Sequence, residues 1–182
     1  TPGDALAVQP RNSTAAAEGL ARVLGFDPSS TIVIEPAVPH APAPLRSVLT
    51  VGELFAAQLD AFGVPRRRFF ALLAHFASDP MQATRLGEFG SPSGTAGRDE
   101  YATRPRRTYA EVLADFRSAR PPLAYFLDLI PPLRERYFSL ASAPAARPGR
   151  AHICVAVVRY RSMLEAPRLG VASNYLASLG IG

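Results

Sequence analysis

The sequence predicts an α+β fold in which short β-strands at both ends of the chain flank a helical insertion. Three observations predict it. Runs of β-branched and apolar residues, typical of strands, occur near both ends of the chain. Helix-capping patterns and aromatic-rich apolar faces are concentrated between them. A chain of 182 residues can bury roughly 70% of its unfolded surface, so a core without disulfides is feasible.

The N-terminal part contains two predicted strands. A turn over Pro2–Asp4 leads into a short strand over Ala5–Val8. The β-branched run Thr31–Ile34 predicts a second strand. The segment Pro36–Pro44 contains four prolines and is typical of a connector.

Capping residues predict the first two helices. The Asn12–Thr14 segment can cap a helix that runs to about Leu24, where Gly25 ends it. The Thr50–Glu53 segment fits a capping box, in which the two side chains bind each other's backbone amides. We expect the second helix to end at Gly63 after an apolar face made of Leu54, Phe55, Leu59 and Phe62.

Further helices are expected up to residue 130. Pro65 suits the first turn of a helix that carries several aromatic residues and ends at Asp79. The Ser91–Gly97 segment predicts a flexible loop. A second capping box at Thr108–Glu111 predicts another helix, and proline pairs bracket a last one over Leu123–Ile130.

The C-terminal part returns to strands. Polar and apolar residues alternate over Arg136–Ser142, and the apolar run Ile153–Val158 predicts a buried strand. A turn over Pro167–Gly170 leads to the start of a helix over Ser173–Leu179.

Composition excludes several classes of protein. All 20 basic residues are arginine and the net charge is +5, yet no known nucleic-acid-binding module accompanies this charge. No apolar run approaches the ~18 residues of a membrane span, so we expect no membrane partner. Cys154 is the only cysteine, and His40, His75 and His152 have no metal-ligand spacing, so we expect no metal. Because the chain begins Thr1-Pro2, we expect it to be a segment of a longer protein.

The strand from Arg136 is the first candidate site. Alternation along a strand places Arg136 and Phe138 on one face and Ser139 on the other. The arginine can hold an anion, and the aromatic ring can cover a flat ligand ring. The alternative is an ordinary strand with an exposed arginine and a core phenylalanine.

Two further segments are candidates. The small residues Gly170–Ser173 open a helix whose free amides can bind phosphate, although an ordinary glycine turn would have the same sequence. Tyr160 lies six residues after Cys154, hence on the same strand face, and could stack on a purine or be a simple amphipathic strand residue.

Taken together, these segments resemble the FAD-binding region of the diflavin reductase family, which includes cytochrome P450 reductase. That family has an Arg-x-Tyr-Ser strand, a strand under the adenine and a Gly-Val-Ala-Thr/Ser helix start. The resemblance covers essentially the whole chain. The segments Val64–Phe70, Arg104–Thr108 and Leu127–Pro131, together with Phe138 in place of the motif tyrosine, are most similar to the branch that supplies electrons to cytosolic iron–sulphur assembly.

The resemblance implies roles for the Arg136 strand. Arg136 would bind the FAD pyrophosphate, Phe138 would lie against the isoalloxazine, and Tyr137 would also contact the cofactor. Ser139 would lie near the flavin N5 and assist hydride transfer, as the catalytic residue.

It also implies the other cofactor contacts. Arg106, on the helical insertion, would reach back to FAD. Cys154 and Ala156 would contact it through their backbone, and Tyr160 would stack near the adenine. The pyrophosphate would be bound by backbone amides and a hydroxyl of Gly170, Val171, Ala172 and Ser173.

The implied architecture is a partial antiparallel flavin-binding β-barrel over residues 1–37 and 132–182, with an all-helical connecting subdomain over 38–131. The longer protein would contain an FMN domain and an NADPH domain and would pass electrons from NADPH through FAD to FMN. Its electron acceptor would be an iron–sulphur assembly protein in the cytoplasm. The alternatives are a P450-type or sulphite-type reductase, or an interaction module that has lost its flavin.

Overall fold

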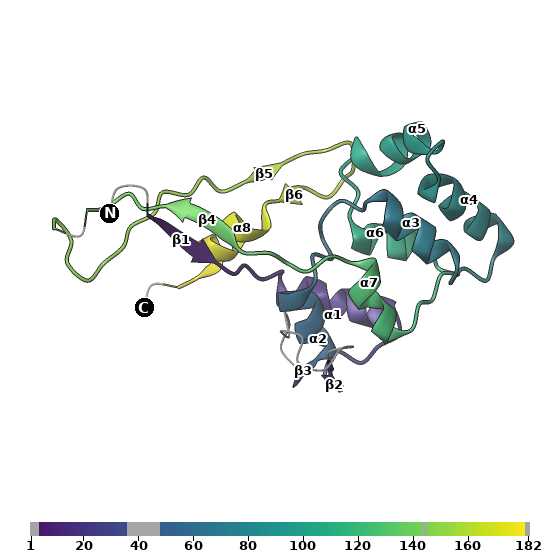
Figure 1. Cartoon of the computed structure of the whole chain (residues 1–182), viewed down its shortest axis with the longest axis horizontal. Coiled ribbons are helices and arrows are strands. Elements are labelled where there is room, and N and C mark those ends of the chain that lie inside the picture. The colour runs from purple at the N-terminus through teal and green to yellow at the C-terminus, as the bar shows by residue number, and fades with distance from the viewer. Residues whose placement is uncertain (1–3, 36–47, 144, 181–182) are drawn as a thin grey trace.

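The structure is a computed structural model that describes residues 4–35, 48–143 and 145–180. A helical body and an elongated arm of strands lie end to end (Figure 1). The predicted connector Pro36–Pro44, the Pro2-Gly3 part of the first turn, His40 and the domain boundary at residues 37 and 38 lie outside the described residues.

The helical body is built from short helices and one small ladder. Its elements are β2 (Thr31–Val33), β3 (Val48–Thr50), α1 (Thr14–Val23), α2 (Val51–Glu53), the π-helical turn η1 (Leu54–Gln58), α3 (Arg67–Ala74), α4 (Pro80–Gly90), α5 (Thr95–Arg98), the π-helical turn η2 (Asp99–Thr103), α6 (Tyr109–Asp115), the 3-10 turn η3 (Leu123–Tyr125) and α7 (Phe126–Leu129). The arm contains β1 (Ala5–Val8), β4 (Arg136–Ser139), β5 (Arg159–Tyr160), β6 (Arg168–Leu169) and α8 (Val171–Ser178).

The mixture of helix and strand is confirmed. The named strands form three two-stranded antiparallel ladders, β1–β4, β2–β3 and β5–β6, and the described residues contain no closed barrel. In the first ladder Val8 pairs with Arg136 and Ala5 with Ser139, so segments from opposite ends of the chain lie side by side. Beside this ladder the Gln9 side-chain amide donates a 2.8 Å hydrogen bond to the carbonyl of Leu133.

The buried strand predicted over Ile153–Val158 is wrong. Ile153 forms an isolated bridge with Leu140, and the β5 ladder begins only at Arg159. Val157 and Val158 are about half exposed, at 55% and 45%. A run of apolar residues becomes a buried strand only where a neighbouring strand and a second layer cover it, and no described segment does so here.

Two predicted helix ends differ from the structure. The helix that begins at Thr50 stops at Gln58, not Gly63, because Leu59 is extended and bridges Pro132. The predicted Ser91–Gly97 loop is partly helical, since α5 begins at Thr95. The first helix ends as expected: Gly25 has a positive φ of 86°, and the amides of Gly25 and Phe26 close a Schellman motif on the last turn.

Aromatic side chains form the centre of the helical body. Phe69 packs edge-to-face on Phe70 and on Tyr109, and Phe126 packs in the same way on Phe55. The core is continuous from α1 to α7, so residues 17–24 of the N-terminal part belong to it. The largest fully buried side chains of the described residues are phenylalanines: Phe55, Phe69, Phe70, Phe89 and Phe126.

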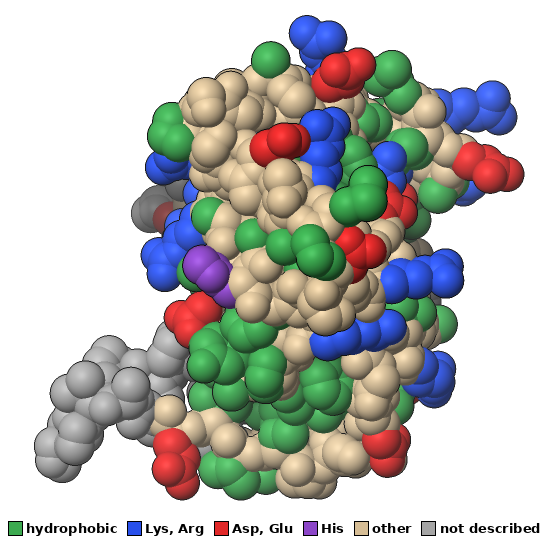
Figure 2. Space-filling view, turned by 90° about the vertical axis from the view of Figure 1, so that its right-hand side faces the viewer, with side chains coloured by type: hydrophobic (Ala, Val, Ile, Leu, Met, Phe, Trp, Pro, Cys, Tyr) green, Lys and Arg blue, Asp and Glu red, His purple; other side chains and the backbone are tan. Residues whose placement is uncertain are grey.

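One glycine permits a close contact between two helices of the body. At Gly90 a Cβ atom would meet the backbone of Ala71 at 2.6 Å, so only glycine allows α4 to approach α3 this closely. On the end of the body shown in Figure 2, arginine and acidic side chains are interspersed, and apolar side chains gather low in the view. The face shown in Figure 2 therefore does not form a positively charged patch.

Candidate functional site

A cavity of about 970 Å³ lies where the arm meets the helical body. Side chains of β4, β5, β6 and α8 line one side of it, and the start of α1, the segment after η1 and the loop before α6 line the other. This volume is at the upper end of the range typical of ligand pockets, about 300–1,000 Å³. The junction between arm and body is thus the place where a large ligand fits.

Five arginines line this cavity, and they fall into two groups. Arg11 makes two hydrogen bonds to the carboxylate of Glu53, and Arg168 makes two to the carboxylate of Glu111. The other three are Arg66, Arg106 and Arg136, and within the described part of the chain none of them forms an ion pair. Among the described residues, no carboxylate therefore competes with a bound anion for these three guanidinium groups.

Arg106 is held in an unusual backbone conformation. Its φ of 59° lies in the left-handed region, which non-glycine residues rarely adopt. The Arg106 amide donates to the carbonyl of Thr103, and α6 begins three residues later. Such strain is typical of functional sites, where the surrounding structure fixes the conformation.

Asp60 is the only acidic residue among the described residues that line the cavity. Burial raises the pKa of its carboxyl, and the positive charges of Arg136 and Arg66 oppose this only in part. The described lining therefore carries more positive than negative side chains, and the charge of its one carboxyl is disfavoured.

The N-terminus of α8 lies against the cavity. Gly170 and Val171 line it, whereas Ala172 and Ser173 are buried behind them. The Ser173 hydroxyl accepts a hydrogen bond from the Val158 amide and donates one to the carbonyl of Gly170. The first amides of a helix have no intrahelical acceptor, so this end favours an anion.

The other predicted residues of β4 lie outside the cavity lining. Tyr137 is 66% exposed and its hydroxyl donates to Glu135. Phe138 is half-buried and pairs with Leu6 in the ladder, and Ser139 is exposed. Arg136 alone brings this motif to the cavity, and its guanidinium donates to the carbonyls of Arg134 and Glu135.

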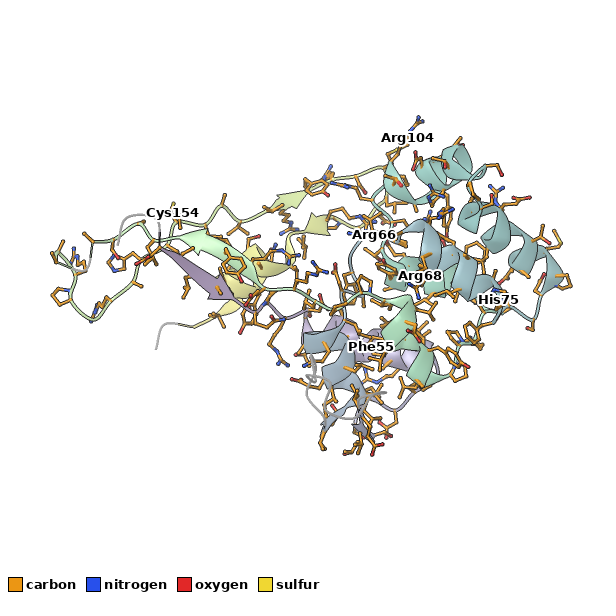
Figure 3. The ribbon with its side chains drawn as sticks, viewed as in Figure 1. Phe55, Arg66, Arg68, His75, Arg104 and Cys154 are labelled. Atoms are coloured by element: carbon orange, nitrogen blue, oxygen red, sulfur yellow. The ribbon has the colours of Figure 1, made fainter. Side chains whose placement is uncertain are left out.

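Of the residues predicted to lie under the adenine, only some line the cavity. Tyr160 lines the cavity from β5. Cys154 and Ala156 are exposed and do not line it, and Figure 3 shows Cys154 far out along the arm, away from Arg66. The structure thus brings together Arg106, Arg136, Tyr160, Gly170 and Val171 from the predicted set.

Sequence reasoning missed several contributors to the cavity, among them Arg66, Asp60 and Tyr175. Arg66 is the N-cap of α3, has an extended backbone and lines the cavity. Its place in the lining could not be predicted from the sequence, because the cavity is formed by segments that are far apart in the chain.

The described residues contain no helix that is both long and apolar enough to cross a membrane. They also contain no group of three or more His, Cys, Asp or Glu residues arranged to hold a metal ion.

Comparisons with known proteins identify similar chains. Residues 1–175 match the family model described as "FAD binding domain". Curated relatives named NADPH-dependent diflavin oxidoreductase 1 are 42% identical over 182 residues in Xenopus laevis and 43% identical over 185 residues in Mus musculus. The Schizosaccharomyces pombe protein of this name is 32% identical over 181 residues. These alignments cover 98–99% of this chain but only 30–31% of each relative's length.

Proposed function

Because the chain belongs to the FAD-binding domain family, we propose that the cavity between its arm and its helical body binds FAD. One observation carries the proposal: Arg66, Arg106 and Arg136 converge on a single cavity, and none of them is used in an ion pair among the described residues. Arginine binds pyrophosphate oxygens through two parallel hydrogen bonds, and the pyrophosphate of FAD carries the matching negative charge.

The cavity also fits the remainder of this cofactor. Its volume of about 970 Å³ suits a ligand of dinucleotide size. The tyrosines Tyr160 and Tyr175 supply aromatic faces for a planar ring, and the N-terminus of α8 supplies free amides for phosphate. One cavity thus offers positive charge for the phosphates of FAD, aromatic side chains for its rings and free amides for hydrogen bonds.

We assign the cofactor contacts as follows. Arg66, Arg106 and Arg136 hold the pyrophosphate together with the α8 amides at Gly170, Val171, Ala172 and Ser173, and Tyr160 stacks near the adenine. From the family pattern we also assign Phe138 and Ser139 to the isoalloxazine, with Ser139 near N5, and Tyr137, Cys154 and Ala156 to further cofactor contacts, although these five residues lie outside the cavity lining. A bound flavin accepts a hydride and releases single electrons, and these side chains orient it and tune its electronics.

The chain spans about 30% of the length of the curated relatives that it matches. We assign to the longer protein an FMN domain and an NADPH domain, and electron transfer from NADPH through FAD to FMN. An iron–sulphur assembly protein in the cytoplasm is its proposed acceptor. The names of the relatives support an NADPH-dependent diflavin oxidoreductase, and a P450-type or sulphite-type reductase is the alternative. Three cavity arginines without an ion pair among the described residues argue against an interaction module that has lost its flavin.

An FAD titration tests the proposal. Purified chain is titrated with FAD, and binding is followed by quenching of flavin fluorescence, with FMN as the competing flavin. Saturable binding that prefers FAD is expected, because FMN lacks the pyrophosphate. Arg136→Ala and Arg66→Ala are each expected to weaken binding at least tenfold, which is about the effect of losing one charge-assisted hydrogen bond.

Arg67→Ala provides the matched control, since Arg67 is exposed beside Arg66 but does not line the cavity. It should bind FAD as the parent chain does. A parallel titration uses a chimera in which the chain replaces the matching segment of the Xenopus laevis relative. If neither the chain nor the chimera binds FAD, the assignment of the cavity is wrong.

A further inference from the structure

One carboxylate connects the two sides of the cavity. Glu111, in the first turn of α6, accepts hydrogen bonds from both Thr108 and Arg168. Thr108 precedes α6 in the helical body, whereas Arg168 lies in β6 of the arm, 57 residues after Glu111. Glu111 itself does not line the cavity.

On the body side, Glu111 fixes the loop that presents Arg106. Its Oε2 atom accepts from the Thr108 amide at 2.8 Å and from the Thr108 hydroxyl at 3.0 Å, and that hydroxyl accepts from the Glu111 amide. This reciprocal capping box holds the backbone two residues after the strained Arg106. The capping box therefore restricts the loop where an arginine must keep a left-handed conformation.

On the arm side, Glu111 fixes the turn that presents Gly170. The Arg168 side chain is only 10% exposed and donates to both Glu111 oxygens, at 2.9 and 3.0 Å, and also to Ser162 Oγ at 3.3 Å. Gly170 and the N-terminus of α8 follow after Leu169. Arg168 is thus used to anchor the turn, although it also lines the cavity.

We infer that Glu111 is a positioning residue for the anion-binding part of the cavity, because it holds the Arg106 loop and the Gly170 turn at a fixed separation. This inference rests on the proposal that the cavity binds FAD. Both carboxylate oxygens are needed: Oε2 faces three donors and Oε1 faces the second Arg168 nitrogen. A glutamine has one oxygen, so its amide nitrogen would face a donor and break part of the network.

The test compares FAD affinity among four variants that are folded by circular dichroism at the temperature of the titration. Glu111→Gln and Arg168→Gln are each expected to weaken FAD binding about tenfold. The double variant should bind no more weakly than the poorer single variant, because both changes remove the same connection. Asp115→Asn is the matched control on α6: it weakens the pair with Arg107, while Arg107 keeps its bond to the Tyr101 carbonyl.

A second readout needs no ligand. Amide hydrogen exchange in Glu111→Gln should accelerate at both 106–108 and 170–173, whereas Asp115→Asn should leave 170–173 unchanged. The inference fails if exchange in these two segments is unaltered, if Glu111→Gln binds FAD as tightly as the parent chain, or if Asp115→Asn weakens binding equally. A parent chain that binds no FAD would contradict the proposed function alone, since the exchange experiment would still decide the role of Glu111.

Discussion

Asn12 connects the N-terminal segment to the end of η1. Its side-chain amide donates to the carbonyls of Phe55 and Leu59, at 2.8 and 2.9 Å, and its backbone amide donates to the carbonyl of Ala56. Asn12 is 6% exposed, so water cannot easily replace these bonds. The sequence suggested a helix cap at this position, but the amide instead satisfies carbonyls that the π-helical turn leaves free.

Replacing this amide should destabilise the fold. We expect Asn12→Ala to lower the free energy of unfolding by about 1–3 kcal/mol, because two buried carbonyls lose their donor. Urea unfolding monitored by circular dichroism measures this. Ser13→Ala is the neighbouring control: the Ser13 side chain makes no capping hydrogen bond, so a change within about 0.5 kcal/mol is expected. Equal effects of the two substitutions would contradict this role of Asn12.

The Glu111 carboxylate should make stability depend on pH. Burial opposes its ionisation, but hydrogen bonds from Arg168 and Thr108 outweigh this and lower the pKa of the carboxyl. A carboxyl with a lowered folded-state pKa stabilises the fold above its unfolded pKa, about 4.3, and loses this contribution as the pH falls through the folded value.

The difference in unfolding free energy between the parent chain and Glu111→Gln should therefore be largest near neutral pH and should shrink below about pH 4. Thermal unfolding at a series of pH values measures it. A difference that stays constant down to pH 3 would mean that ionisation of Glu111 does not stabilise the fold.

At the scale of the element, one glycine inside α1 and one just after it have opposite requirements. Gly25, just beyond the helix, has a φ of 86°, while Gly19 lies inside the helix, and a Cβ atom at either position would meet nothing within 4 Å. Steric contact therefore plays no part, and only backbone conformation distinguishes the two positions.

We expect Gly25→Ala to destabilise the chain by about 1–2 kcal/mol, the cost of a left-handed conformation for an L-residue. Gly19→Ala should instead stabilise it by about 0.5–1 kcal/mol through higher helix propensity. Paired thermal or urea unfolding curves test both substitutions. If both substitutions changed the free energy of unfolding in the same direction, the Schellman motif at the end of α1 would not determine the effect of replacing Gly25.

At the scale of the whole molecule, packing is concentrated in the helical body. The core cluster runs from Ala17 to Ile130, whereas in the arm the amides of Val155, Ala156 and Val157 make no hydrogen bond within the described residues. Native-state hydrogen exchange should therefore be slow for Phe70 and Leu73 and fast for residues 155–157. Comparable protection in both segments would indicate a covering layer over the arm.

How much could be predicted differs between body and arm. The capping boxes and aromatic faces specified the helices because these signals are local, and Thr108–Glu111 forms its capping box as expected. The end of η1 was missed because it depends on Asn12 and Pro132, which are far away in sequence. The same limit applies to the site: Arg106 and Arg136 follow from motifs, whereas Arg66 joins them only through the tertiary fold.

The pairing of β1 with β4 has a consequence for how such a molecule is assembled. The chain leaves this ladder after Val8 and returns at Arg136, its register partner, and the bond from Gln9 to Leu133 holds the two connections together. A tight two-residue turn in place of the intervening residues would close β1 and β4 into an ordinary hairpin. The path of β1 and β4 is therefore independent of the length of the segment inserted between them.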